Sequence, residues 1–408
     1  MATPRAGSIL LVVLALFASA RGDGAADAVG LNERALRLAE EGRLEDAVKL
    51  LEAALKASPD DATIRTNLGK YSANLGAQLL EKGDAASAEQ ATRRARDLLP
   101  TDPVIRLNLA ACLDERGYPE RAAAEVRKAV ELGPKLAGAH DRLGTVLYRE
   151  GLLEEAADEW QKAVELAPRD TAIAERLARA RASLAAEAKL TRQTSAHFEI
   201  RFDLERDAVL ASKILQAMEE AHGVVGADLQ HFGQERLVVV LLPDDEFREL
   251  MGVHEWVAGL YDGRIRLPVK GAGQHEAELL ARARHEYVHS VLAPLGKRAP
   301  SWLHEGLAQV FEGRSVAQAL RRVAVSDPVL FASLRDSFAA TKSADRVRLQ
   351  YDTALAFVHW LRDGERAGAF RATMRSLFDD AALVPAFEDA YGAGPEALYE
   401  KFTAAFPR

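Results

Sequence analysis

The feature that most constrains this chain is a 34-residue repeat in its first half. Three residue types recur at that spacing, namely Pro100, Pro134 and Pro168, Gly83, Gly117 and Gly151, and Ala88, Ala122 and Ala156. Seven extra residues separate these copies from an earlier one, which carries Gly42, Ala47, Leu51, Ala54 and Pro59. Glycine suits a turn between helices, alanine a close helix contact, and proline the end of a unit. Each unit is therefore predicted to be a helix pair that stacks on its neighbours, because it cannot bury its own apolar face.

This pattern resembles the tetratricopeptide (TPR) repeat. The fourth copy shows it best, with Leu143, Gly144, Leu147, Gly151, Ala156, Trp160, Ala163 and Pro168. The following run, Thr171 to Leu190, lacks Gly and Pro and is predicted to be a capping helix. A generic helical bundle is the alternative, although it would not keep three residue types in one register. The resemblance implies a TPR α-solenoid over residues 29–194 that binds a protein partner.

A second feature is the segment His285-Glu286-Tyr287-Val288-His289, which lies in a run from Glu276 to Leu292 without Pro or Gly. That run is predicted to be a helix, so His285 and His289 lie one turn apart on the same face. Two imidazoles at this separation can bind one metal ion, and Glu286 is close enough to contact a water on that ion. A solvated helix face that happens to carry two histidines is the alternative.

The next segment supplies a third candidate ligand. Pro294, Gly296 and Pro300 end the first helix, and a second helix is predicted to begin near Ser301, with that serine as its N-cap. Glu305 falls in the first turns of this helix, within Trp302-Leu303-His304-Glu305-Gly306-Leu307-Ala308. Three protein ligands with the fourth position left for water are typical of catalytic zinc sites.

HEYVH followed by WLHEGLA resembles the gluzincin metallopeptidases, the clan of thermolysin, the M1 aminopeptidases and bacterial peptidase MA-like domains. The resemblance implies one Zn²⁺ per chain, bound by His285, His289 and Glu305. It also implies that Glu286 is the general base that activates the zinc-bound water, and that a Tyr or His stabilises the oxyanion. Tyr351 is our candidate for that last role, with simple core packing as the alternative.

This chain departs from the clan's pattern in two ways. The gap between the second histidine and the third ligand is short, and Gln309 stands where thermolysin-like enzymes have an Asp that orients a zinc-bound His. His304 is predicted to point to a different helix face and not to bind the metal. Tyr287 is predicted to face the core.

The pattern changes near Ser195, and residues 195–408 are predicted to form an α+β zincin-type metallopeptidase domain with a helical C-terminal lobe. The expected elements are a strand at 197–203, a helix at 206–225, a buried strand at 237–242, an edge strand at 261–268, a helix at 351–361, and one or two helices in 379–406. The resemblance to zincins implies that the edge strand borders the cleft and pairs with an extended substrate, a role that falls to the 261–268 strand. An ordinary edge strand is the alternative. The fold class of the whole chain is therefore mainly α.

The N-terminus predicts export. Arg5 precedes the apolar stretch Ile9 to Phe17, and Ala18-Ser19-Ala20 follows as a cleavage site. Residues 1–20 are thus predicted to be a signal peptide and 21–28 a linker. The alternative, an uncleaved anchor, needs a longer stretch, because a spanning helix takes ~20 apolar residues. We expect a periplasmic or extracellular bacterial protein with no stable membrane span after cleavage.

Charge and cysteine content exclude other classes. The net charge of −8, without a lysine-rich run, argues against a nucleic-acid partner. Cys112 is the single cysteine, so no intramolecular disulfide forms, and its apolar surroundings predict a core position.

Together these features predict an exported zinc metallopeptidase, with an endopeptidase mode favoured, whose TPR repeats recruit protein partners or substrates. The alternative is a TPR interaction scaffold with a catalytically silent metallopeptidase-like domain. A zinc hydrolase that acts on something other than peptides is a third reading.

Overall fold

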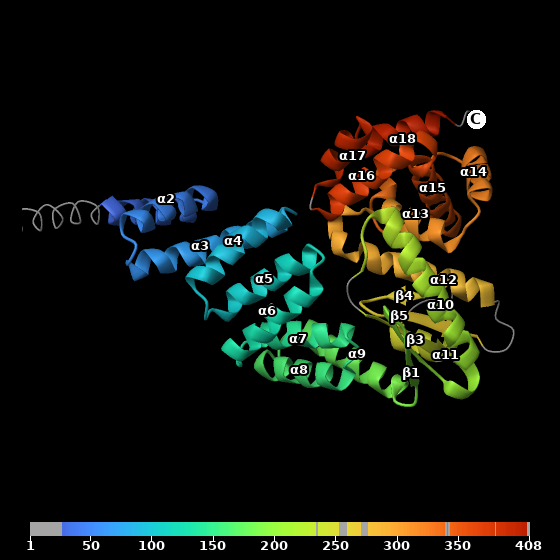
Figure 1. Ribbon diagram of the computed structural model, residues 1–408, viewed down its shortest axis with the longest axis horizontal. Helices are drawn as coiled ribbons and strands as arrows, with labels where there is room; N and C mark the ends of the chain where they lie inside the picture. The colour runs from blue at the N-terminus through green and yellow to red at the C-terminus, as the bar shows by residue number, and fades with distance from the viewer. Residues whose placement is uncertain are drawn as a thin grey trace, which may run out of the picture. The chain divides into compact units, whose positions relative to one another are not determined.

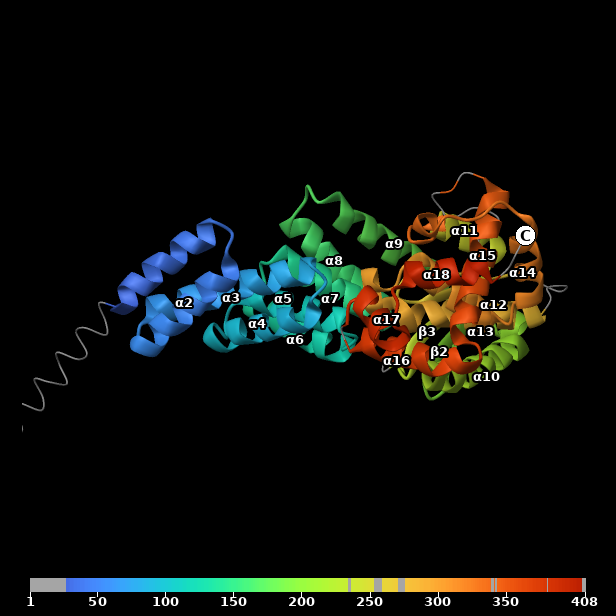
Figure 2. The same ribbon diagram turned by 90° about the horizontal axis from the view of Figure 1, so that it is seen from above.

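The computed structural model describes residues 27–233, 236–252, 259–270, 276–338, 341, 343–379 and 381–405 (Figures 1 and 2). The chain is mainly helical, as predicted, with one small sheet. The predicted signal peptide and all but the end of the predicted linker lie outside these residues. Within them, no helix has both the length and the apolarity to cross a membrane. Two compact units, Met1–Cys112 and Leu113–Arg408, are described separately below.

The first unit consists of paired helices. Residues 27–40 are helical and are followed by α2 (Leu44–Ala57), α3 (Ala62–Glu81), α4 (Ala85–Leu98) and the greater part of α5 (Pro103–Glu115). The repeated alanines are fully buried, and Gly42 and Gly83 adopt positive φ angles of 80° and 84° at the turns. Both observations agree with the roles that the repeat predicts. Cys112 is buried as predicted, and burial raises the pKa of its thiol to about 11.

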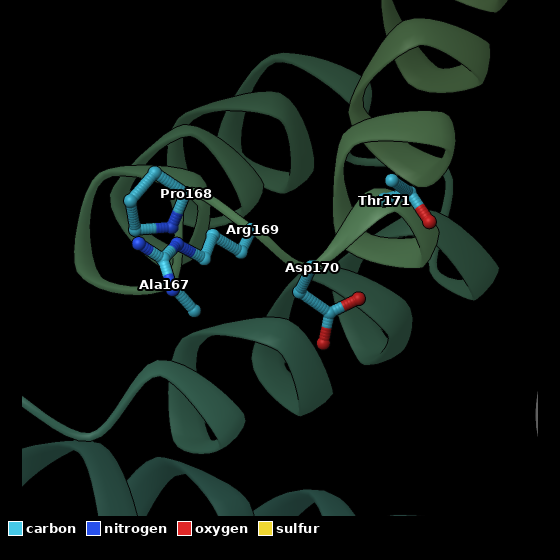
Figure 3. Close-up of a pocket in the computed structure, with 5 residues that line it drawn as sticks. All are labelled: Ala167, Pro168, Arg169, Asp170 and Thr171. Atoms are coloured by element: carbon cyan, nitrogen blue, oxygen red, sulfur yellow. The ribbon is translucent and has the colours of Figure 1, made fainter.

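The second unit begins with further repeat helices, α6 (Pro119–Leu132), α7 (Ala137–Arg149), α8 (Leu153–Leu166) and α9 (Thr171–Glu187). In the fourth copy, a Cβ on Gly144 would lie 2.8 Å from the Trp160 ring, so only glycine permits this contact between α7 and α8. At the next turn, the Asp170 carboxylate accepts hydrogen bonds from the backbone N–H groups of Ala172 and Ile173 and caps α9 (Figure 3). The surface hollow at this turn is lined by five consecutive residues, 167–171. The carboxylate among them, that of Asp170, already accepts the hydrogen bonds of the cap.

The sheet has five strands in the order β1-β2-β3-β5-β4, namely β1 (Thr191–Thr194), β2 (Phe198–Phe202), β3 (Leu237–Pro243), β4 (Leu260–Tyr261) and β5 (Ile265–Val269). Strands β2, β3 and β5 are parallel, and the two outer strands are antiparallel to their neighbours. The prediction that 261–268 forms the edge strand was therefore wrong in part. The chain reverses at Gly263, whose φ is +100°, so β4 is the edge and β5 lies inside the sheet.

The two faces of the sheet are different. One face presents Ile200, Val239 and Ile265 to the core shared with α10 (Leu204–Leu229) and α12 (Glu276–Leu292). The alternate residues, such as Val240, point to the other face, where α9 and α11 (Asp244–Met251) pack. This second face also carries charged side chains. Arg201 and Arg264 are buried there, and both donate hydrogen bonds to the carboxylate of Glu187 in α9.

A helical lobe follows, with the 3₁₀ segment Ala293–Arg298, α13 (Ser301–Glu312), α14 (Val316–Val325), α15 (Ala344–Arg362), α16 (Ala367–Phe378), α17 (Leu383–Tyr391) and α18 (Pro395–Ala404). Trp302 is fully buried between Phe357 and Phe387. Ser301 is the first helical residue of α13, so the prediction that it is the N-cap was wrong. Pro300 holds that position, without a side-chain hydrogen bond.

The predicted domain boundary between residues 194 and 195 stays a prediction. It falls between β1 and β2, which are paired antiparallel neighbours, whereas the compact units divide within α5.

Candidate metal centre

Two helices bring the three predicted ligands together. Helix α12 spans the predicted range and places His285 and His289 on one face, and α13 adds Glu305. The Nε2 atoms of the two histidines lie 3.7 and 3.8 Å from Oε2 of Glu305. One ligand atom from each residue lies within 4.8 Å of the others, and this is the only such group found among the described residues. Tetrahedral zinc would hold its ligand atoms about 3.3–3.5 Å apart, and the two distances from the histidines to Glu305 are a few tenths of an ångström longer than this.

The short gap between the helices is closed by a tight turn. Residues Ala293–Arg298 form a 3₁₀ segment, and Gly296 within it has φ 50° and ψ −129°. Few residues other than glycine tolerate this backbone conformation. A second glycine, Gly306, follows the third ligand, and its Cβ would lie 2.6 Å from the carbonyl oxygen of Ala354. Glu305 is therefore carried on a helix that can approach α15 closely.

A carboxylate that the sequence reasoning missed orients one ligand. Nδ1 of His285 lies 3.1 Å from Oε2 of Glu312. A proton on Nδ1 would be donated to this carboxylate, which leaves the Nε2 lone pair free to face Glu305 and the metal position. Burial alone would raise the pKa of Glu312, but the hydrogen bond and charge of His285, together with nearby arginines, lower it to about 2.

Glu312 lies seven residues after Glu305, two turns along the same face of α13, and not one turn on as in thermolysin-like enzymes. The residue one turn on, Gln309, has a different role. Its amide donates to the backbone oxygens of Glu305 at 3.1 Å and Tyr351 at 2.9 Å. Gln309 therefore ties α13 to α15 through backbone oxygens.

The predicted base, Glu286, is buried next to the start of the edge strand. Only 6% of the residue is exposed. Burial raises the pKa of its carboxyl group, and the charge of His285 opposes this shift. A Cβ on Gly259 would lie 2.8 Å from Oε1 of Glu286. Glycine at this position, which the sequence reasoning also missed, leaves room for the carboxylate.

Burial also shifts the pKa values of other residues at the site. It raises the pKa of Glu305 to about 7 and lowers that of His289 well below its ordinary value, with help from the charge of His285. Both shifts favour neutral side chains, and a divalent cation would favour the Glu305 carboxylate instead. His304 is not among the grouped ligands, but its ring lies nearly parallel to that of His289, with centroids 5.8 Å apart. The prediction that it points to a different helix face and does not bind the metal stays a prediction, and burial lowers its pKa to about 4.

The two tyrosines differ in position. Tyr287 is buried, as predicted, and its hydroxyl lies 2.9 Å from Nδ1 of His222. Tyr351 is half-buried on α15, with its ring edge against Phe338. Burial raises the pKa of Tyr351, and the negative charge of Glu305 raises it further, so the hydroxyl keeps its proton and lies within electrostatic reach of the site. Its catalytic role stays a prediction.

The comparisons with known proteins concern the repeats. A model described as tetratricopeptide repeat matches residues 28–71. This match supports the predicted TPR repeats, and with them a role in protein–protein interaction for that part of the chain. No curated protein matches the chain.

Several solved structures of TPR proteins are similar in part. The first TPR of Spaghetti (RPAP3) bound to HSP90 peptide SRMEEVD is 22% identical, with 29% of this chain and 93% of that chain covered and a TM-score of 0.28. YrrB, a TPR protein with an unusual peptide-binding site, is 21% identical, with coverages of 39% and 78% and a TM-score of 0.32. A thermophilic TPR protein of Thermus thermophilus is 21% identical, with coverages of 38% and 98% and a TM-score of 0.23.

Proposed function

We propose that this chain is an exported zinc-dependent peptidase whose TPR repeats bind protein partners or substrates. One observation carries the proposal, namely that His285, His289 and Glu305 converge from two helices while the Glu286 carboxylate lies on the same helix face. The donor set of two imidazoles and one carboxylate suits Zn²⁺ and leaves a position for water. The Glu312 carboxylate behind His285 supports the same assignment, since zinc-bound histidines donate their second N–H to such a partner.

When bound, zinc would polarise the scissile carbonyl and lower the pKa of a bound water to about 7. Glu286 accepts the proton of the attacking water on its carboxylate and then donates it to the leaving amine. The buried environment raises the pKa of Glu286, which makes its protonated form a usable acid in the second half of this transfer. Proton transfer by a positioned group contributes ~10²–10⁴ in rate.

The substrate would be an extended peptide. Strand β4 is an edge strand of the sheet, and Gly259, the residue before it, lies against Glu286. A peptide added to this edge by backbone hydrogen bonds would pass the base, which is the geometry that endopeptidase cleavage needs. Tyr351, whose hydroxyl keeps its proton, would donate a hydrogen bond to the developing oxyanion.

The second candidate function is an interaction scaffold with a catalytically silent domain. The match of the TPR family to residues 28–71 favours it, because protein binding by the repeats needs no turnover at the metal centre. A zinc hydrolase acting on another bond shares the ligands and differs only in substrate.

The purified chain tests the proposal through metal analysis and hydrolysis of an unfolded protein, with and without a chelator. We expect about one zinc per chain and chelator-sensitive cleavage. Glu286→Gln should keep the zinc and lose at least ~10²-fold in rate, whereas His289→Ala should lose both. Wild-type cleavage by Glu286→Gln, or zinc-loaded protein without any hydrolysis, would contradict the peptidase proposal, and the second result would favour the scaffold.

A further inference from the structure

Arg282 is a cationic side chain beside the metal centre that the proposed mechanism does not use. It lies three, four and seven residues before His285, Glu286 and His289 on α12, so all four side chains share one helix face. The Arg282 side chain is 19% exposed, as is that of His289. It is therefore positioned along the same partly open surface as the metal ligands.

Arg282 forms a long ion pair with Glu312 that leaves its hydrogen-bond donors without an acceptor among the described residues. Its Nη2 lies 3.8 Å from Oε1 of Glu312, beyond hydrogen-bond distance, and its Nε is buried without a partner. Glu312 already accepts hydrogen bonds at 3.1 Å from Nδ1 of His285 and Nε of Arg314. No residue in the described part of the chain accepts a hydrogen bond from Arg282. A guanidinium carries five N–H donors in a planar fork that matches a carboxylate.

Arg282 is also the cation that acts on the carboxylates of the site. Its charge favours the ionised forms of Glu286, Glu305 and Glu312, whereas Arg314 contacts Glu312 and its side chain is half exposed. In a site of low dielectric constant, the Arg282 guanidinium can attract a negatively charged group on the substrate.

We propose that Arg282 binds a carboxylate on the substrate residue that follows the scissile bond. This inference rests on the proposed function, because the position follows from the role of Glu286. Glu286 donates its proton to the leaving amine, and that amine belongs to the residue after the scissile bond. Arg282 lies one helical turn from Glu286 and so contacts the same part of the substrate. The carboxylate is either an Asp or Glu side chain or the free C-terminus of a substrate that ends there.

Matched peptides test this by their kcat/KM values. One pair carries Glu or Gln after the scissile bond, and a second pair ends at that residue with a free carboxylate or an amide. We expect the wild-type chain to prefer at least one charged member by about tenfold or more, as one charge-assisted hydrogen bond provides. The preferred pair identifies the source of the carboxylate. Arg282→Gln should reduce the preference to about one, and Arg282→Lys should keep part of it.

Arg314→Gln is the matched control, because Arg314 also contacts Glu312 but is half exposed, and it should leave the preference unchanged. Zinc content should stay near one per chain in all these variants. Binding of the same peptides, labelled with a fluorophore, to zinc-loaded Glu286→Gln gives a readout that does not need turnover. There too the charged peptide should bind more tightly, and addition of Arg282→Gln should remove the difference.

The outcomes separate the inference from the proposed function. Equal cleavage and equal binding of both members of each pair by the wild-type chain would overturn the role of Arg282 and leave the peptidase proposal intact. Loss of zinc from both Arg282 variants would also overturn it, because Arg282 would then be a structural counter-ion of Glu312. Binding of the charged peptide that depends on Arg282, without any cleavage, would support the inference and contradict the peptidase proposal.

Discussion

Replacing Glu187 by glutamine should destabilise the second unit strongly, because this carboxylate neutralises buried arginines. Glu187 lies at the end of α9, and its side chain is only 3% exposed. Its two oxygens accept hydrogen bonds from Nη1 and Nη2 of Arg264 at 2.9 and 2.6 Å, and one of them also accepts from Arg201 at 2.8 Å. Arg264 is fully buried.

The expected magnitude follows from what each arginine retains. Arg201 keeps Glu199 at 2.8 Å and the carbonyl oxygen of Gly151 at 2.7 Å, so it remains paired. Arg264 bonds to no other carboxylate in the described residues and would be left charged and buried. Removal of one partner of a buried ion pair costs about 3–5 kcal/mol. That loss is about a fifth or more of the ~5–15 kcal/mol by which a typical domain is stable.

Urea unfolding of the full chain, followed by circular dichroism and tryptophan fluorescence, measures this loss. Glu276→Gln is the control, because its ion pair with Lys213 has a similar length, 2.7 Å, but is nearly half exposed on both sides. It should cost less than about 1 kcal/mol. Adding Arg264→Met to Glu187→Leu should recover most of the stability, since an apolar pair replaces the buried charges. A loss below about 1 kcal/mol for Glu187→Gln, no larger than that of an exposed pair, would refute the reasoning.

Three further predictions concern the metal centre and the domain boundary. Glu312→Gln should weaken zinc binding about 10–100-fold, as expected when the partner of a zinc-bound histidine is lost; competition with a chelating dye measures it, and unchanged affinity would contradict the role of Glu312. Gly259→Ala should lower kcat at unchanged zinc affinity, because its Cβ would displace the Glu286 carboxylate; Gly223→Ala, with open space around its Cβ, is the control and should be neutral. A fragment of residues 137–408 should be more stable to urea than a fragment of residues 195–408. Only the longer fragment keeps Glu187 and the contacts of Ala186 and Leu190 with the second face of the sheet. Equal stabilities would show that residues 195–408 fold as stably without these contacts and would support the boundary at residue 195.

The helices and strands that could be predicted best from the sequence are those with a strong local pattern. Helix α12 has the predicted bounds, because its run contains no Pro or Gly, and β3 was recognisable as a continuous apolar run. Strand β1 was missed because the residues of Thr191–Thr194 are polar and mostly exposed, so no alternation marks them. Helix α15 begins at Ala344 and not at Tyr351, because its first residues are largely charged and polar.

The centre could be predicted in part for the same reason. His285 and His289 are one turn apart in the sequence, and Glu305 is on the next helix, so local spacing was enough to bring them together. Gly259 reaches Glu286 from the sheet edge, and Glu187 reaches Arg264 across 77 residues. Those contacts depend on how the strands are ordered, and the ordering prediction was wrong in part, since β4 and not β5 is the edge.

Glu312 is the instructive case, because it lies on the same helix as Glu305 and was still missed. The expectation followed the clan's spacing and examined only the residue one turn after the third ligand, which is Gln309. A helix face recurs at both four and seven residues, so a carboxylate at either position can reach the same histidine. In this chain the nearer position ties α13 to α15 through backbone oxygens, and the farther one contacts His285. Helical periodicity therefore predicts Glu312 where a fixed motif spacing does not. The same periodicity read backwards from His285 reaches Arg282, the residue that we infer contacts the substrate.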